Sequence, residues 1–180
     1  IGYVQQNPDN QIVTDKVWHE LAFGLESLGF DNASIRRRVA EMANFFDIQG
    51  WFRKSVTELS GGQKQLLNLA SVMVMQPKVL ILDEPAAQLD PIAASEFMRT
   101  LYRINREIGT TVIISEHRLE ELFPMADRVA VMDEGKIICC DSPRNVGTAL
   151  AAAEHPMFYG LPAVMKIYAR AGAGGECPMT

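Results

Sequence analysis

Two short apolar segments, residues 79–82 and 111–115, constrain the fold of this chain most strongly. Each is dominated by consecutive aliphatic or β-branched residues, the pattern of a strand buried on both faces of a parallel sheet. A helical stretch separates them: Pro91 can occupy its first turn, it reaches about Glu107, and Gly109 can end it. This alternation of strand and helix predicts an α/β layered domain.

The rest of the chain fits around this pair of strands. Residues 1–4 form a further predicted strand, and residues 129–132 and 136–140 flank Asp133-Glu134-Gly135, which predicts a hairpin. Apolar residues recur at helical spacing through residues 17–28 and 35–46. We therefore expect a domain over residues 1–148, with a helical subdomain at about 14–76 and a core at about 1–6 and 77–141. Residues 149–180, which carry prolines and the glycine-rich run 171–175, are expected to be a C-terminal extension or linker.

Composition narrows the class of protein. The 180 residues suffice for one domain with a real core or for a piece of a larger one, and the net charge of −5 argues against a nucleic-acid surface. The three cysteines, Cys139, Cys140 and Cys177, are odd in number and form no Cys-x-x-Cys pair, which favours a reducing compartment. No long apolar run predicts a membrane span. The first residues read as the middle of a strand, so we expect the chain to begin inside a domain.

The stretch Leu59-Ser60-Gly61-Gly62-Gln63 stands directly before a helical segment. Its glycines let the backbone approach a ligand closely, and the helix that follows points free N–H groups and a positive dipole end toward the loop. The Ser60 hydroxyl and the Gln63 amide add hydrogen-bond donors. The stretch is a candidate phosphate site, and the alternative is a plain Gly-Gly turn before a helix.

Asp83 and Glu84 follow the apolar segment 79–82, at the edge of a parallel sheet where α/β proteins bind ligands. Mg²⁺ takes one or two carboxylates plus substrate phosphates, so Asp83 is a candidate to hold this ion through its water shell. Glu84 would point in another direction and could orient and deprotonate an attacking water. The alternative is that Asp83 caps a turn and Glu84 is solvated.

His117 and Gln6 also follow predicted strands. If the strand 111–115 neighbours the strand 79–82, His117 stands beside Glu84 and could hydrogen-bond a γ-phosphate oxygen or the attacking water. Gln6 could offer its carbonyl oxygen to Mg²⁺. A structural histidine and an ordinary loop glutamine are the alternatives, because neither residue is specific by itself.

The order of these features resembles the ATP-binding subunits of ABC transporters, from Ile1 to about Asp141. The matching motifs, in chain order, are the Q-loop glutamine (Gln6), the signature motif (residues 59–63, letter for letter), the Walker B strand (residues 79–83), the catalytic base (Glu84), the D-loop (residues 86–90, ending at Asp90) and the switch histidine (His117).

This resemblance implies a P-loop NTPase-like parallel sheet layered with helices and carrying an ABC-type helical subdomain. It implies ATP and Mg²⁺ as ligands and ATP hydrolysis as the activity of the complete protein. The implied catalytic residues are Glu84, His117 and Gln6, and the implied metal-binding residues are Asp83 and Gln6. The implied nucleotide-binding residues are Leu59, Ser60, Gly61, Gly62, Gln63 and Asp90.

The family resemblance also implies partners. The signature of one ATPase faces the phosphate loop of a second, head to tail, so residues 60–62 would act on a partner's ATP. The helical insertion, about residues 14–54, would pass movement to a transmembrane subunit, with Gln6 linking it to the γ-phosphate. The expected location is therefore the cytoplasmic face of the membrane, as a peripheral subunit, and no nucleic acid is expected as a partner.

A narrower resemblance is to the energy-coupling factor group, whose ATPases drive uptake of vitamins and of cobalt or nickel ions. It rests on residues 6–11 (QNPDNQ), 23–26 (FGLE) and 115–121 (SEHRLEE). Residues 88–94 (QLDPIAA) and 161–163 (LPA) resemble the first half of fused versions that carry two ATPase domains.

The chain departs from the family in three places. No Gly-x-x-x-x-Gly-Lys-Ser/Thr phosphate loop occurs in it, so we expect the 180-residue chain alone to bind ATP poorly and not to hydrolyse it. Ala86 and Ala87 stand where Thr and Ser are usual, which would remove hydrogen bonds that couple two nucleotide sites. Gln5 stands where an aromatic or apolar residue is common, with no consequence derivable from the sequence.

Rival interpretations remain. A soluble ABC ATPase of DNA repair has the same motifs, but the interval from Gln6 to Leu59 here is short, without heptads or cysteines. A translation-associated ABC ATPase would not copurify with a membrane component. A non-catalytic assembly module, which completes a partner's site, is the third alternative.

Overall fold

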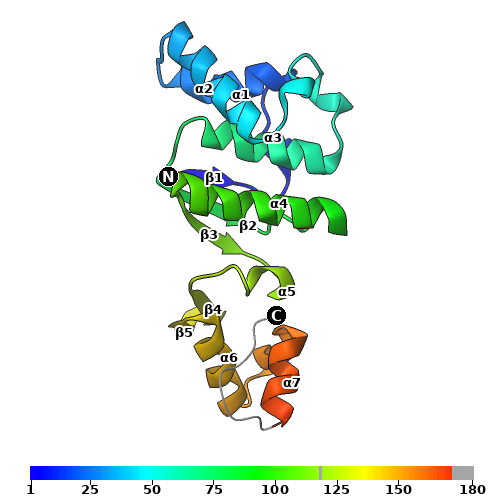
Figure 1. Cartoon of the computed structure of the whole chain (residues 1–180), viewed down its shortest axis with the longest axis vertical. Helices are drawn as coiled ribbons and strands as arrows, with labels where there is room; N and C mark the ends of the chain where they lie inside the picture. Colours follow the sequence, from blue (N-terminus) through cyan, green and yellow to red (C-terminus); the bar gives the residue numbers. More distant parts are fainter. Residues whose placement is uncertain (118, 172–180) are drawn as a thin grey trace. The chain divides into compact units, whose positions relative to one another are not determined.

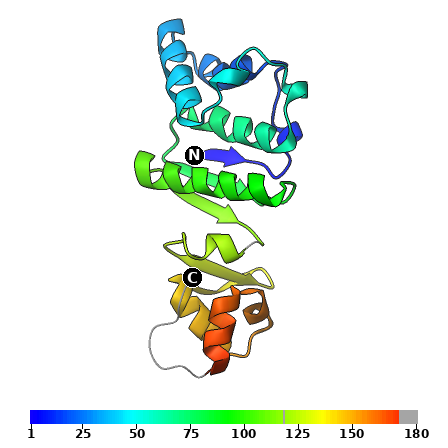
Figure 2. The same ribbon diagram turned by 45° about the vertical axis from the view of Figure 1, so that its right-hand side comes forward.

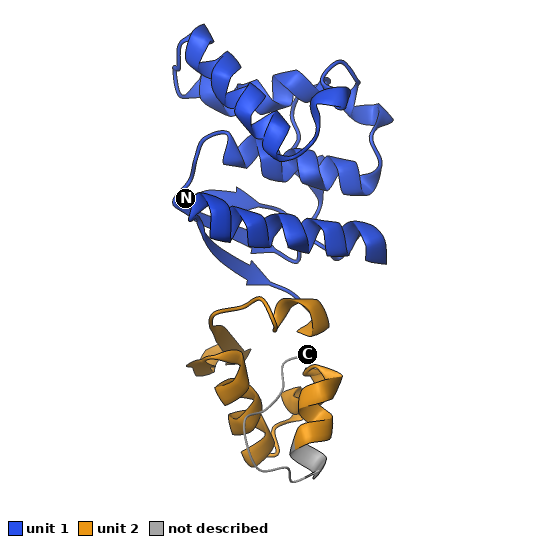
Figure 3. Ribbon diagram, viewed as in Figure 1, with its two compact units in different colours: residues 1–116 blue, residues 117–180 orange. Residues whose placement is uncertain are grey.

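The computed structural model describes residues 1–117 and 119–171 and divides the chain into two compact units, Ile1–Glu116 and His117–Thr180 (Figure 3). Arg118, Cys177 and the glycines of the run 171–175 lie outside the described residues. The domain boundary predicted near residue 148 does not coincide with the division between the units. None of the helices in the described part of the chain is long and apolar enough to cross a membrane.

The first unit is built on a three-stranded parallel sheet with the order β1-β2-β3 (Figure 1). The strands are β1 (Gly2–Val4), β2 (Val79–Asp83) and β3 (Thr111–Ser115). Leu80 and Leu82 of β2 are almost completely buried on one face of the sheet. The predicted α/β fold with a parallel sheet is confirmed. The carboxyl ends of all three strands meet at one edge, and the candidate site lies there.

β3 differs from the prediction that it is buried on both faces. Its residues alternate between exposed and half-buried, and Ile113 is 54% exposed. β3 is an edge strand of this sheet, with a neighbour on one side only. Apolar composition shows that a segment is a strand, but it does not show which strand ends the sheet.

The crossover between β2 and β3 follows its sequence signals. Helix α4 (Pro91–Arg103) has Pro91 in its first turn and lies across one face of the sheet (Figure 2). It continues as a π-helical turn, η4 (Ile104–Ile108), and the chain leaves it at Gly109. Gly109 has a φ of 78°, a conformation that glycine adopts without steric cost.

The helical subdomain consists of α1 (Val17–Ser27), α2 (Asn32–Phe45) and α3 (Gly61–Met73), with 3₁₀ turns η1 (Pro8–Asn10), η2 (Gln49–Trp51) and η3 (Val56–Glu58). The Asp31 carboxylate caps α2 by accepting from two backbone N–H groups at 3.0 Å. Lys16 is the N-cap of α1 and makes no side-chain hydrogen bond there. Helix α1 packs on both α2 and α3.

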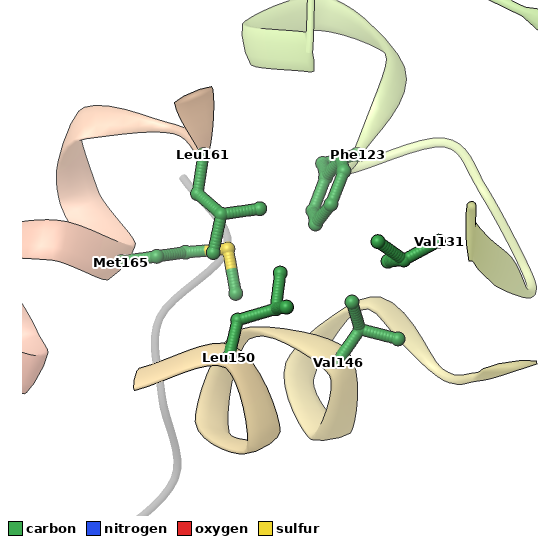
Figure 4. Close-up of a cluster of buried hydrophobic side chains, with 6 residues drawn as sticks. All are labelled: Phe123, Val131, Val146, Leu150, Leu161 and Met165. Carbon is green, nitrogen blue, oxygen red and sulfur yellow. The ribbon is translucent and has the colours of Figure 1, made fainter. Parts of the chain in front are cut away.

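The second unit contains α5 (Leu119–Leu122), the hairpin β4 (Val129–Asp133) and β5 (Lys136–Asp141), α6 (Pro143–Ala152), η5 (Pro156–Gly160) and α7 (Ala163–Ala171). Glu134 and Gly135 both have positive φ, as a tight hairpin turn requires. Its core joins α5, β4, α6 and the segment 161–165 (Figure 4), through Phe123, Val131, Val146, Leu150, Leu161 and Met165.

The described residues after 149 hold more structure than the expected linker. Helix α6 runs to Ala152, and Leu150, Leu161 and Met165 are each at most 3% exposed. Prolines at 156 and 162 loosen the sequence pattern, yet both stand at or just before the start of a helix, where proline is tolerated.

Candidate functional site

The acidic pair lies at the carboxyl edge of the sheet, next to the end of β3. Asp83 pairs in register with Ser115, whose hydroxyl donates to Asp83 Oδ1 at 2.7 Å. The Glu84 N–H donates to the carbonyl and hydroxyl oxygens of Ser115 at 3.1 and 3.2 Å. Ser115 therefore orients both acids. Sequence reasoning did not single it out, because its signal is readable only when the two strands are set in register.

Glu84 has an unusual backbone conformation. Its φ is 42°, which a residue with a side chain adopts only at a cost on the order of 1 kcal/mol. Backbone hydrogen bonds hold this conformation: the Glu84 N–H donates to the carbonyl and hydroxyl oxygens of Ser115, and the Glu84 carbonyl oxygen accepts from the Ala87 N–H at 3.1 Å. The turn takes Glu84 out of the strand direction of Asp83. The Asp83 carboxylate accepts from Ser115 of β3, whereas the Glu84 carboxylate accepts from Gln6, which follows β1.

Gln6 is brought to the same edge by β1. Its Nε2 donates to Glu84 Oε2 at 3.3 Å, although the two residues are far apart in the sequence. β1 and β2 are parallel neighbours, with Val4 opposite Leu82, so the residues that follow these strands meet. Gln6 therefore lies at the same edge of the sheet as the acidic pair, and its predicted roles in metal binding and catalysis stay predictions.

Asp83 and Gln6 offer oxygen donors of the kind that Mg²⁺ prefers. The Ser115 hydroxyl donates to Oδ1 of Asp83, and among the described residues no hydrogen bond is recorded to Oδ2 or to the amide oxygen of Gln6. Mg²⁺ is usually held by one or two carboxylates together with water and substrate phosphates, and this donor set fits that chemistry. Within residues 1–117 and 119–171, no group of three or more His, Cys, Asp or Glu residues could hold a metal without such help.

The signature motif forms the amino end of α3. Ser60 Oγ accepts from the Gln63 N–H at 3.3 Å, while Gln63 Oε1 accepts from the Ser60 N–H at 3.0 Å. This reciprocal capping box fixes the first turn. It leaves the N–H groups of Gly61 and Gly62 at the helix end, where a phosphate could accept from them. Leu59 is only 6% exposed and anchors the motif in the core.

The D-loop joins β2 to α4. The Asp90 carboxylate accepts from the N–H groups of Ile92 and Ala93 at 3.0 Å and so caps α4. Ala86 is completely buried and Ala87 is exposed. Of the two positions, only position 87 would place a hydroxyl at the surface of this chain. The nucleotide-binding role proposed for Asp90 stays a prediction beside this capping role.

A small cavity of about 90 Å³ brings three motifs together. It is lined by the Q-loop, the amino end of α3 and the D-loop, through Gln6, Pro8, Asp9, Gly61, Lys64, Gln65, Pro85, Gln88 and Leu89. Gly62 lies close to α4: a Cβ on Gly62 would stand 3.0 Å from the Cβ of Ala93. The signature motif therefore packs closely beside the D-loop of its own chain.

His117 is the first residue of the second unit. The strand that precedes His117, β3, is the parallel neighbour of β2, as the prediction for His117 required. The position of His117 beside Glu84 stays a prediction.

Comparison with known proteins identifies the family. The family model described as ABC transporter matches residues 1–87. An ABC transporter ATP-binding protein of Bacillus anthracis is 56% identical over 146 residues, which cover 81% of this chain and 26% of that protein. The energy-coupling factor transporter ATP-binding protein EcfA1 of Symbiobacterium thermophilum is 44% identical, over 81% of this chain and 50% of that protein.

A solved structure agrees with these relatives. It is that of cbiO1 from Clostridium perfringens, described as part of the ABC transporter complex cbiONQ, with 36% identity and a TM-score of 0.76 over 92% of this chain and 66% of that one. The chain thus spans about a quarter of the first relatives and about half of EcfA1. Both resemblances stated from the motifs are confirmed. The chain belongs to the ABC transporter ATP-binding family, with energy-coupling factor ATPases among its relatives.

Proposed function

We propose that the protein containing this chain hydrolyses ATP to power uptake of a small solute, such as a vitamin or a metal ion, through a membrane transporter. The relatives support this proposal, because they include EcfA1 and cbiO1, a part of the transporter complex cbiONQ. The observation that carries the chemistry is the cluster of Gln6, Asp83, Glu84 and Ser115 at one edge of a parallel sheet.

Within this cluster each group has a distinct task. Glu84 would accept a proton from the attacking water, which Gln6 helps to position. Asp83 and the amide oxygen of Gln6 would hold Mg²⁺, which when bound neutralises charge on the phosphates. Ser115 fixes the Asp83 carboxylate, and the resemblance to ABC ATPases implies that His117 would contact the γ-phosphate.

The signature motif would serve a second ATPase domain. The Ser60 hydroxyl and the N–H groups of Gly61 and Gly62 form a rigid anion-binding end of α3. The resemblance to ABC ATPases implies that this end faces the phosphate loop of a second ATPase domain, so the bound phosphate would belong to a partner. The partner would be a second copy or a fused second ATPase domain.

A membrane subunit would contact the helical subdomain. Large apolar side chains are exposed on and beside α1: Trp18 is 43% exposed, Phe23 47% and Leu28 63%. Exposed apolar groups of this size on one short element are typical of a docking surface. This partner would hold the protein as a peripheral subunit at the cytoplasmic face of the membrane.

The test uses the full-length protein that contains this chain, purified with and without its membrane component. We expect Mg²⁺-dependent phosphate release that the Glu84→Gln variant loses while it still binds ATP. The isolated 180-residue chain is the internal control and should release no phosphate. A full-length protein that binds no ATP, or whose hydrolysis is indifferent to Glu84→Gln, would disprove the proposal.

A further inference from the structure

The loop after β1, residues 5–11, is held against the first two turns of α3 by three side chains of that helix. Lys64 Nζ forms an ion pair with Asp9 at 2.7 Å. Gln65 Nε2 donates to the carbonyl oxygen of Gln5 at 3.1 Å. Asn68 Nδ2 donates to Gln11 Oε1 at 3.1 Å. The helix that begins with the signature motif is thus bonded to the loop that carries Gln6.

The direction of each amide in this network is fixed. Gln11 Nε2 donates to the Tyr3 carbonyl oxygen at 2.9 Å, so Gln11 Oε1 is the acceptor for the Gln5 N–H, also at 2.9 Å. Asn68 must then present its NH₂ group to the same oxygen. Gln65 must likewise present its NH₂ group to a carbonyl. Because both backbone polar groups of Gln5 are bonded to side chains, the position of the next residue is tightly set.

Packing alone does not explain these two amides on α3. Gln65 and Asn68 are both 0% exposed, and within residues 1–117 and 119–171 no hydrogen-bond partner is recorded for Gln65 Oε1 or Asn68 Oδ1. A buried oxygen without a partner destabilises a fold. An apolar residue of similar size would fill the space without this cost. The benefit of the amides must therefore lie in what their NH₂ groups hold.

We propose that Gln65 and Asn68 are positioning residues that make the Q-loop and the signature helix move as one body. The path runs from α3 through Gln5 to Gln6, whose Nε2 bonds Glu84. When the amino end of α3 moves toward the ATP of a partner, the Q-loop moves with it, and Gln6 changes its position relative to Glu84. The base of one site thereby senses whether the signature of the same chain is engaged. This inference rests on the proposed ATPase function.

The test compares substitutions at Gln65 in the full-length protein. Gln65→Met keeps the volume and loses the donor. Gln65→Glu also places an acceptor against the Gln5 carbonyl. We expect kcat to fall about 10- to 100-fold, more in Gln65→Glu than in Gln65→Met, with the KM for ATP within about twofold. Gln49→Met is the matched control, because it breaks a 2.8 Å surface bond to Asn44 outside the network.

Hydrogen exchange supplies a readout that does not need ATPase activity. Gln65→Met should speed exchange in residues 5–11 while the middle of α3 stays protected. If the wild-type protein proves not to hydrolyse ATP, the proposed function fails and this arm still tests the linkage. If α3 does not tolerate a change at 65, Gln11→Met breaks the network from the half-buried loop side. Unchanged kcat together with unchanged exchange in residues 5–11 would overturn the proposal, as would a loss of kcat equal to that of Gln49→Met.

Discussion

The side chains of Gln6 and Glu84, 78 positions apart in the sequence, meet in a hydrogen bond of 3.3 Å. The bond follows from the pairing of β1 with β2, since the residue after each strand reaches the same edge of the sheet. It makes Gln6 the group through which a movement of its loop reaches the proposed base. Gln6 is exposed and Glu84 is half-buried, so the contact lies where a substrate can reach it.

Replacing Glu84 by Gln should abolish turnover without abolishing binding. The amide has the same shape but cannot accept the proton of an attacking water, so we expect ATP hydrolysis to fall about 10²- to 10⁴-fold. Phosphate release and equilibrium ATP binding, measured on the full-length protein, separate the two effects. Glu96→Gln, on the exposed face of α4, is the control. Retention of most of the hydrolysis would assign the base to another residue.

Ser115→Ala should weaken the metal dependence of the reaction. It removes the 2.7 Å bond that orients the Asp83 carboxylate and one acceptor of the Glu84 N–H. Groups that orient a metal ligand typically contribute 10- to 100-fold in metal affinity, so we expect the Mg²⁺ concentration for half-maximal activity to rise by about that factor. Ser115→Thr keeps the hydroxyl and should therefore keep the Mg²⁺ concentration for half-maximal activity near the wild-type value. An unchanged Mg²⁺ titration in Ser115→Ala would show that Asp83 needs no such support.

Much of the first unit could be predicted because its signals are local. The apolar run 79–82, Pro91 and Gly109 each act on their own segment. β2 and the continuous helical segment made by α4 and η4 agree with them. The motif order placed Gln6 and the acids at one edge, since parallel strands share their carboxyl end.

The features missed depend on register and tertiary packing. Ser115 becomes a site residue only because β2 and β3 align Asp83 with it. The sequence gives no consequence for Gln5, because its role is carried by its backbone groups, which bond Gln11 and Gln65. The helices after residue 149 were obscured by prolines, and what stabilises them is a core drawn from distant segments.

The two alanines of the D-loop should respond oppositely to a hydroxyl. Ala86 is completely buried, so Ala86→Ser buries a hydroxyl beside an apolar site and should cost about 1–3 kcal/mol in the free energy of unfolding. Ala87 is exposed, so Ala87→Ser should change stability by less than about 0.5 kcal/mol. Only Ala87→Ser is then expected to raise the ATPase rate through a new contact with a partner. Denaturant unfolding and ATPase assays of both variants check this, and a destabilised Ala87→Ser would contradict it.

Acid should loosen the start of α6 through Asp141. Hydrogen bonds from the Ser142 N–H and the Asn145 side chain, with the nearby charge of Arg128, hold the pKa of Asp141 below its ordinary value of 3.8. A depressed folded-state pKa means that the stabilisation is complete above 3.8 and is lost as the pH falls through the folded-state value. Asp141→Asn should therefore reduce the acid-induced loss of amide protection in α6, measured by hydrogen exchange. If amide protection in α6 falls with pH equally in the wild-type protein and in Asp141→Asn, Asp141 does not contribute to the acid-induced loosening.

Gly147→Ala should test the packing of the second unit. A Cβ on Gly147 would overlap Met165 Cε, and Met165 is 1% exposed, so the methionine has little room to move. Overpacking of this kind typically costs about 1–3 kcal/mol, against a gain in helix propensity of up to about 1 kcal/mol. We expect net destabilisation in denaturant unfolding of the full-length protein.

Gly160→Ala, whose Cβ would meet nothing within 4 Å, is the matched control. In the Gly147→Ala/Met165→Ala double variant the two costs should be less than additive, because the smaller side chain leaves space for the new methyl group. Strict additivity, or a stabilised Gly147→Ala, would mean that α6 and the Met165 side chain do not pack as closely as the structure shows.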